Sequence, residues 1–340
     1  MPTRHGEPAV AALPSPFPEG WYFVGSRPAV EKAGLIQKTW MGETVVVWSD
    51  EDGQACVAEA VCPHLGSQLG PDAGGRVREG RLVCPFHGFE FDASGQCVAT
   101  PYAPPPRSAR LRVFHTREIH GLIFAWWGID GREPQWELPE DPPDEGDWCA
   151  AEIRTTRFPG HPQETTENSV DLAHLRYVHG YDSVSRADPL AIDGHRLVSR
   201  FDFKSVRRIA GFATITFDIA ANARIFGLGY SFVEIHERSI GMEMRLWILA
   251  TPVDGTDIDL SQVSQVRTIR RPKRWIAGLG FLPTGWRAPL MNRFIVTRQQ
   301  QDVQQDVVIW QRKKFLPRPR LNRADGEIVA FRDYCTQFYA

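Results

Sequence analysis

Two short stretches, Cys62-Pro63-His64-Leu65-Gly66 and Cys84-Pro85-Phe86-His87-Gly88, decide how this chain is interpreted. Each stretch offers one thiolate and one imidazole, and the nineteen residues between His64 and Cys84 can form a hairpin that brings the two loops face to face. Two Cys and two His could bind a tetrahedral zinc ion, or a [2Fe-2S] cluster in which His replaces Cys on one iron. The one-residue spacing of the first pair and the two-residue spacing of the second favour the cluster, because zinc ribbons more often use Cys-x-x-Cys pairs.

The composition indicates a globular enzyme-sized chain. Its 340 residues are long for a single core, which favours two domains or one domain with a large extension. Hydrophobic residues make up 42% and charged residues 24%, and the net charge of −2 lacks the basic footprint of a nucleic-acid partner. The longest apolar stretch, Gly121–Ile129, is too short to span a membrane and predicts a buried strand.

The N-terminus and the cysteines predict a cellular location. Residues 1–20 are rich in Pro and have no apolar core of a signal peptide, so we expect a flexible lead-in and a cytoplasmic protein. Six cysteines should then stay reduced. Four of them have no paired spacing and are expected to be buried thiols: Cys56, Cys97, Cys149 and Cys335.

Changes of pattern along the chain predict an α+β protein. Short β-rich runs over residues 21–130 predict an all-β domain, and the Pro- and acid-rich residues 131–150 predict a linker. Residues 151–340 predict an antiparallel sheet with helices, including a hairpin around Asp254-Gly255. We expect helices over Thr165–His179 and Pro289–Lys313.

The first of these helices carries a second group of possible metal ligands. Asp171 and His174 would share one helical face, while His174 and His179 stand five residues apart, which splays them by about 140° on a regular helix. Both can bind one ion only if the helix widens or ends between them. Two His and one carboxylate form the facial triad of non-haem iron oxygenases, and the distant carboxylate could be Asp302 or Asp306.

Three motifs in the same order resemble those of the Rieske-type non-haem iron oxygenases, and they extend over nearly the whole chain. These are Cys-x-His with Cys-x-x-His at 62–87, Asn-x-x-Asp-x-x-His-x₄-His at 168–179, and Gln-Asp-x-x-Ile-Trp at 305–310. The last motif and the terminal FRDYCTQFY are similar to the 3-ketosteroid 9α-hydroxylase and cholesterol 7-desaturase branch. The resemblance implies an N-terminal Rieske [2Fe-2S] domain followed by a larger catalytic domain of the helix-grip type.

The same resemblance assigns roles to individual residues. The cluster ligands would be Cys62 and Cys84 on one iron and His64 and His87 on the other. A mononuclear Fe(II) would be bound by His174, His179 and Asp306. Asp171 would bridge to a cluster-ligating histidine across a subunit contact and carry the electron path, and Asn168, which opens the motif, would support catalysis.

The resemblance also implies a reaction and partners. A terminal oxygenase would take electrons from a separate ferredoxin or flavin reductase, use NAD(P)H only indirectly, and hydroxylate or desaturate a bulky apolar, steroid-like substrate with O₂. The sequence agrees on the external donor, because no Gly-x-Gly-x-x-Gly follows a strand. Family members commonly form head-to-tail trimers, so a homotrimer is expected. The basic stretch Arg267–Arg274 could dock the donor or be a solvated loop.

The substrate pocket and the function class leave alternatives. Large apolar residues of the second domain could line the pocket, although most should be ordinary core: Phe212, Phe217, Ile225, Phe226, Phe232, Trp247, Phe281 and Trp286. An oxygenase for aromatic, choline-like or other small substrates is the alternative within the enzyme class. Outside that class the alternatives are an electron carrier without oxygenase activity and a zinc-stabilised binding module.

Overall fold

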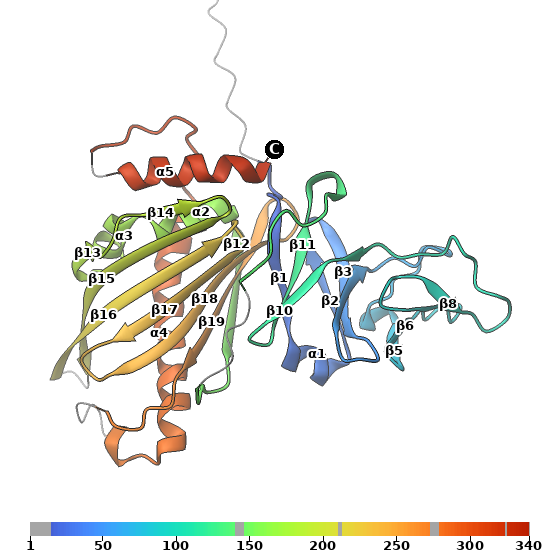
Figure 1. The fold of residues 1–340 in the computed structure, drawn as a ribbon, viewed down its shortest axis with the longest axis horizontal. Coiled ribbons are helices and arrows are strands. Elements are labelled where there is room, and N and C mark those ends of the chain that lie inside the picture. Colours follow the sequence, from blue (N-terminus) through green and yellow to red (C-terminus); the bar gives the residue numbers. More distant parts are fainter. Residues whose placement is uncertain (1–14, 140–145, 210–212, 273–278, 324, 340) are drawn as a thin grey trace, which may run out of the picture.

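The computed structural model describes residues 15–139, 146–209, 213–272, 279–323 and 325–339. An N-terminal part, all β except for the short helix at Arg27–Ala33, is followed by a larger part in which one broad antiparallel sheet carries helices (Figure 1). The α+β fold expected from the sequence is therefore confirmed. Of the lead-in expected at 1–20, residues 1–14 lie outside the described residues. Phe17, within the rest of this segment, packs edge-on against Trp127, with ring centroids 5.9 Å apart. The lead-in is therefore attached to the N-terminal part at Phe17.

Three small antiparallel sheets form the N-terminal part, in the orders β1-β11-β10, β2-β3-β4-β9 and β5-β6-β7-β8. Its elements are β1 Gly20–Ser26, α1 Arg27–Ala33, β2 Leu35–Trp40, β3 Glu43–Ser49, β4 Ala55–Glu59, η1 Pro71–Ala73, β5 Arg76–Arg78, β6 Arg81–Val83, β7 Glu90–Phe91, β8 Cys97–Ala99, β9 Val113–Phe114, β10 Thr116–Ile119, β11 Leu122–Trp127 and the turn η2 Ile129–Gly131. The longest apolar stretch of the sequence forms β11, a buried strand as predicted.

An eight-stranded antiparallel sheet forms the larger part, in the order β12-β19-β18-β17-β16-β15-β13, with β14 paired to β15. The strands are β12 Glu152–Pro159, β13 Asp182–Arg186, β14 Ala191–Asp193, β15 Arg196–Ile209, β16 Ala213–Phe226, β17 Tyr230–Glu237, β18 Met242–Pro252 and β19 Asp257–Val266. The predicted β18–β19 hairpin is confirmed. Its turn closes because Asp254 Oδ1 accepts hydrogen bonds from the backbone N–H groups of Thr256 (3.0 Å) and Asp257 (2.9 Å).

The helices of this part pack on the sheet and at its edge (Figure 1). They are α2 Pro162–Thr166, η3 Glu167–Ser169, α3 Leu172–Tyr177, η4 Leu279–Phe281, α4 Thr284–Trp310, α5 Gly326–Cys335 and η5 Thr336–Tyr339. The long helix α4 lies against one face of the sheet, where Trp310 stacks on Phe158 with centroids 5.7 Å apart. Among the described residues no helix is both long and apolar enough to cross a membrane.

Helix α4 begins five residues earlier than the sequence predicted and ends at Trp310 instead of Lys313. Pro289, expected at its start, lies inside it. A proline inside a helix removes one backbone hydrogen bond. The buried contacts of Ala288 and Asn292 on either side of it oppose this cost, so packing outweighs local propensity here.

A shared hydrophobic core joins the two parts. Phe124 of β11 packs against Tyr230 of β17, with ring centroids 5.2 Å apart. Trp136, within the segment expected to be a linker, lies edge-on to Trp126 at 4.6 Å, and its carbonyl accepts a hydrogen bond from Trp21 Nε1 at 2.9 Å. Residues 140–145 of that segment lie outside the described residues. Trp136 therefore joins the common core.

Candidate active site

The two Cys-His loops lie side by side in the N-terminal part. Cys62 and Cys84 are buried, whereas His64 and His87 are half-buried, and their imidazole rings meet edge to face with centroids 4.8 Å apart. None of the six cysteines, all of which lie in the described part of the chain, forms a disulfide. Two buried thiols on one side and two neighbouring imidazoles on the other are the donor set of a mixed Cys/His [2Fe-2S] cluster, so the residues present fit that group.

The loops are tight turns that depend on glycine. Gly66 N–H donates to the Cys62 carbonyl (2.9 Å) and Gly88 N–H to the Cys84 carbonyl (3.1 Å). Gly88 has a φ of +67°, and a Cβ there would lie 2.8 Å from Pro101 Cγ. Both facts exclude an unstrained larger residue at this position. The backbone therefore fixes where the ligand side chains point.

The helix expected over Thr165–His179 is broken into three short pieces, α2, η3 and α3. Asp171 is the N-cap of α3: its Oδ1 accepts from the backbone N–H groups of Ala173 (3.0 Å) and His174 (3.3 Å). Asp171 is therefore not on a continuous helical face with His174. The last helical residue of α3 is Tyr177, so the helix ends between His174 and His179, which is one of the two distortions that a shared ion requires.

Helix α4 brings a carboxylate to these two histidines across more than a hundred residues of sequence. The ligand atoms of His174, His179 and Asp306 all lie within 4.8 Å of one another. His179 Nε2 is 3.3 Å from Asp306 Oδ2, and these two side chains are only 6% and 9% exposed. The imidazole centroids of His174 and His179 are 5.2 Å apart. Two imidazoles and one carboxylate at this separation fit a mononuclear non-haem iron.

Hydrogen bonds orient both imidazoles. His174 Nδ1 is bonded to the Asp171 carbonyl, and His179 Nδ1 lies 3.1 Å from Gln305 Oε1. Because both partners are oxygen acceptors, each Nδ1 carries the proton and each Nε2 presents its lone pair, as metal-binding histidines require. The sequence analysis missed Gln305 in this role, although it stands next to Asp306 in the motif.

The electrostatics of the two histidines differ. Burial lowers the pKa of His174, which favours the neutral ring. At His179 burial also acts to lower the pKa, but the hydrogen bond with Asp306 and the charge of that carboxylate outweigh it, so the net pKa is raised. A raised pKa favours a second proton on the His179 ring. Metal binding requires a neutral imidazole, so an ion bound by His179 and Asp306 would replace this second proton.

The other candidate residues lie around this group. Asp302, one turn before Asp306, accepts a hydrogen bond from the hydroxyl of Tyr181 at 2.9 Å and is not part of the three-residue group. Asn168 lines the adjoining cavity with His174 and His179. The backbone carbonyl of Asp171 is hydrogen-bonded to His174 Nδ1, whereas the Asp171 side chain caps α3.

A cavity of ≈ 210 Å³ adjoins the three-residue group between α4 and the sheet. Its walls are mainly apolar and come from strands β15 to β19: Phe203, Ala223, Val233, Leu246, Ile248 and Leu260. Polar side chains at its edge include Gln262 and Gln299, and Gln299 Oε1 is buried without a hydrogen-bond partner. The arrangement places possible metal ligands at the wall of a mainly apolar cavity.

Comparison with known families assigns the chain. Residues 20–115 match the Rieske [2Fe-2S] domain, and residues 125–339 match the 3-ketosteroid 9α-hydroxylase C-terminal domain. The chain belongs to this family of Rieske-type oxygenases. The oxygenase is thus an oxidoreductase that works with a Rieske cluster, a mononuclear iron and O₂.

Relatives of the oxygenase carry steroid-related names. It is 29% identical to cholesterol 7-desaturase of Ciona intestinalis, over 96% of this chain and 70% of the relative. It is 28% identical to the oxygenase component of 3-ketosteroid-9-alpha-monooxygenase from Rhodococcus rhodochrous, over 96% of this chain and 85% of the relative. The fold is similar to that of dicamba monooxygenase bound to dicamba, with a TM-score of 0.69 and 18% identity over 94% of this chain and 96% of the other.

The cavity of the oxygenase is lined by other residues than those suggested from the sequence. Ile225, Phe226, Phe232 and Trp247 are buried core, Phe217 packs at the far end of the sheet, and Phe281 and Trp286 are exposed. Phe212 lies outside the described residues. Strand alternation separates the two sets of residues but does not say which set faces the cavity: Val233 and Leu246, each next to a core residue in sequence, point to the opposite face and line the cavity.

Proposed function

We propose that this oxygenase hydroxylates or desaturates an apolar, steroid-like substrate at a mononuclear Fe(II) held by His174, His179 and Asp306. The observation that carries the proposal is the apolar cavity in whose wall these three side chains meet. The steroid preference is supported by the C-terminal domain match and by the names of the two relatives described above. Both relatives cover most of this chain.

The proposed chemistry divides between the metal and the chain. A ferrous ion with two His and one carboxylate keeps coordination positions open for O₂ next to a bound substrate. The chain's own part is to orient the imidazoles through the Asp171 carbonyl and Gln305, to exclude water with the apolar walls, and to hold the substrate in the cavity.

Electrons would enter through a cluster held by Cys62, His64, Cys84 and His87. In Figure 1 the sheet β5–β8, which bears the second loop, and the helix α3 lie at opposite ends of the chain. The proposed cluster ligands and the proposed iron ligands therefore lie in different parts of one chain. We therefore propose a homotrimer in which the cluster of one copy faces α3 of the next, with Asp171 as the bridge and Asn168 beside it.

The electron donor is a separate protein in this proposal. The Rhodococcus relative is named as an oxygenase component, which implies a partner that delivers electrons. A ferredoxin or flavin reductase would fill this place, and NAD(P)H would be consumed only by that partner. Exposed Leu65 and Phe86 beside the cluster ligands offer an apolar contact for it or for the neighbouring copy.

A smaller substrate is the second candidate, and the cavity volume favours it. At ≈ 210 Å³ the cavity is smaller than the roughly 300–1,000 Å³ typical of sites for drug-sized ligands, so a steroid requires side chains to move. Two solved structures with the same fold are described as complexes of small aromatic molecules, one with dicamba and one with caffeine.

Replacing Asp306 by Ala tests the metal assignment. The native protein should contain about three irons per chain, two in the cluster and one mononuclear. The Asp306→Ala variant should keep the cluster signal in EPR and lose about one iron together with product formation. Asp302→Asn, one turn away, is the matched control and should keep all the iron. Loss of iron only from Asp302→Asn would assign the ligand to Asp302.

A substrate screen tests the reaction. The native oxygenase, with a reductase and NADH, is incubated with a panel of sterols, ketosteroids and small aromatic acids, and products are identified by mass spectrometry. Product formation from a steroid supports the proposal, and product formation only from small aromatics would establish the second candidate. A protein whose cluster is reduced and reoxidised without any product, and which contains only the two cluster irons, would be an electron carrier.

A further inference from the structure

The N-terminal half of α4 carries a row of exposed apolar side chains. Trp286, Leu290 and Phe294 follow at intervals of four residues and are 64%, 48% and 52% exposed. This spacing keeps them on one side of the helix. Phe281, in η4 immediately before α4, is 84% exposed. We call these four residues the apolar row.

The other side of the same helix is firmly packed. Ala288, Asn292 and Val296 are buried. The Asn292 side-chain amide donates to the Ser264 carbonyl at 2.9 Å and to the Ala150 carbonyl at 3.3 Å. Because these contacts fix the helix on the sheet, the apolar row faces outward in the folded protein. Soluble proteins rarely leave a large contiguous apolar patch without a binding partner.

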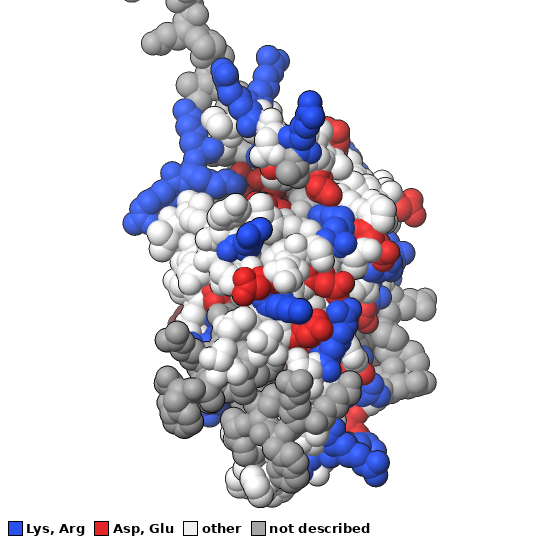
Figure 2. Space-filling model, turned by 90° about the vertical axis from the view of Figure 1, so that its left-hand side faces the viewer, with Lys and Arg blue, Asp and Glu red and all other residues white. Residues whose placement is uncertain are grey.

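The chain segment that bears the apolar row is basic, although two of its arginines, Arg267 and Arg270, are paired with Glu243 and Asp147. Residues 267–301 contain eight Lys or Arg and no Asp or Glu. Arg271, Arg293 and Arg298 are exposed, and the Arg298 guanidinium lies 5.7 Å from the centroid of the Phe294 ring. In the end-on view of Figure 2, Lys and Arg side chains lie at the lower right edge of this face. Exposed aromatics flanked by Arg are typical of helices that lie on anionic lipid.

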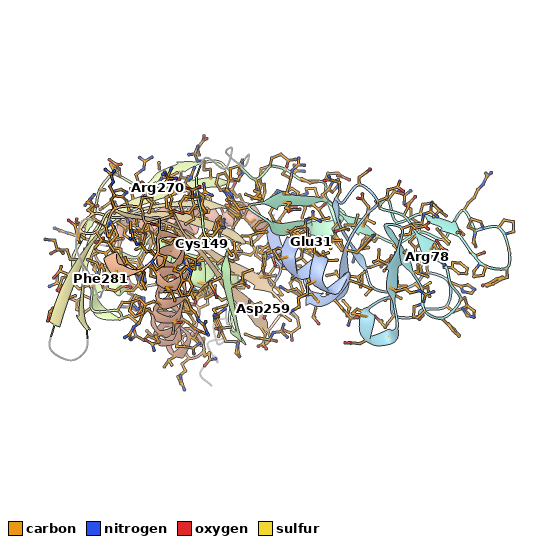
Figure 3. All side chains as sticks on the ribbon, turned by 90° about the horizontal axis from the view of Figure 1, so that it is seen from below. Glu31, Arg78, Cys149, Asp259, Arg270 and Phe281 are labelled. Carbon is orange, nitrogen blue, oxygen red and sulfur yellow. The ribbon has the colours of Figure 1, made fainter. Side chains whose placement is uncertain are left out.

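The position of the apolar row disfavours an electron donor as its partner. Figure 3 places Phe281 and Arg78 at opposite ends of the molecule, and Arg78 belongs to the sheet that bears a cluster loop. A donor must approach the cluster of its own subunit or of a neighbour, and an approach to the cluster of its own subunit would not reach the apolar row. Further along α4, Gln299, Val303 and Asp306 line the cavity. At 1.5 Å per residue, Gln299 is only about 7–8 Å along the helix axis from Phe294.

We propose that the apolar row inserts into the surface of an anionic lipid bilayer, with the flanking arginines on the headgroups. Helix α4 then connects the bilayer to the cavity, so an apolar substrate can pass from lipid to the active site without crossing water. The inference of lipid binding depends only on the exposed apolar row and the flanking arginines. Only the delivery of substrate rests on the proposed function.

Co-sedimentation with vesicles tests the binding. The native holoprotein should sediment with vesicles of phosphatidylcholine and phosphatidylglycerol, bind pure phosphatidylcholine more weakly, and be partly released by salt. Trp286→Ser/Phe294→Ser should lower the partition coefficient by roughly tenfold or more. The matched control, Ile192→Ser/Val329→Ser, also replaces two exposed apolar residues and should bind as the native protein does.

Three outcomes would overturn the proposal. The first is no sedimentation of the native protein with either vesicle, and the second is equal binding by the Trp286→Ser/Phe294→Ser variant with its cluster spectrum intact. The third is a change of oligomeric mass in that variant by light scattering without lipid binding, which would make the apolar row an interface between copies. Turnover is measured in parallel with substrate supplied by cyclodextrin. Normal turnover without lipid binding removes this inference alone, whereas lipid binding without any turnover removes only the proposed function.

Discussion

Replacing Gln305 by Leu should weaken iron at the mononuclear site and leave the Rieske cluster intact. Gln305 Oε1 lies 3.1 Å from Nδ1 of His179, and this contact fixes the ring so that Nε2 points to Asp306. Leucine has a similar size and no acceptor. The His179 ring would then be free to rotate or to change its tautomer, and either change removes the lone pair from the ion.

The expected loss is about tenfold in Fe(II) affinity. Removing an outer hydrogen-bond partner of a metal-binding histidine usually weakens the metal by roughly 10–100-fold. The His179 side chain is only 6% exposed, which protects the bond, but Gln305 itself is exposed, so water can partly replace the lost oxygen. These two facts favour the lower end of the range, or about 1.4 kcal/mol.

An anaerobic titration measures this loss. The mononuclear iron is removed with a chelator that leaves the cluster in place, and Fe(II) is returned in competition with a ferrous indicator. Gln304→Leu is the matched control, because this neighbouring exposed glutamine has its amide 3.5 Å from Thr156 Oγ1 and makes no contact with His179 in the structure. Unchanged affinity in Gln305→Leu, with a normal cluster signal, would refute the orienting role of Gln305.

Two further substitutions test other parts of the site. Asp171→Asn should keep the N-cap of α3 and the thermal midpoint, because Asn caps helices as well as Asp does. The substitution removes the charge proposed to bridge to the neighbouring cluster, so product formation should fall by roughly tenfold or more. Full activity with normal iron content would show that Asp171 only caps the helix. Gly88→Ala should destabilise the second cluster loop by more than about 1 kcal/mol and lower the cluster content of the protein. Gly285→Ala is the control and should change neither, because the added Cβ meets nothing within 4 Å. Equal cluster content in both variants would contradict the strain argument.

Local sequence was sufficient to propose most of the metal-binding residues of this protein. The residue types and their short spacings can be recognised because each pair of donors lies within one loop or at one helix end. Residues so close in sequence can adopt few arrangements relative to one another. The paired loops at Cys62 and Cys84 lie together as the hairpin argument requires, and α3 ends between His174 and His179 as their five-residue spacing requires for a shared ion. The β18–β19 hairpin and the buried strand β11 likewise follow from turn residues and apolar runs.

Long-range packing determines the position of Asp306 and Gln305 and the residues that line the cavity. Sequence patterns carry little information about such packing. Asp306 and Gln305 reach His179 only because α4 packs across the sheet in one register, which depends on contacts with strands far away in the chain. The cavity wall could not be predicted for a related reason. Phe232 and Trp247 are paired across β17 and β18 and enter the core shared by the two parts, while their neighbours Val233 and Leu246 line the cavity. Where a strand is buried on both faces, as over residues 246–250, consecutive positions are apolar, so alternation alone cannot tell which face belongs to the core and which to the cavity.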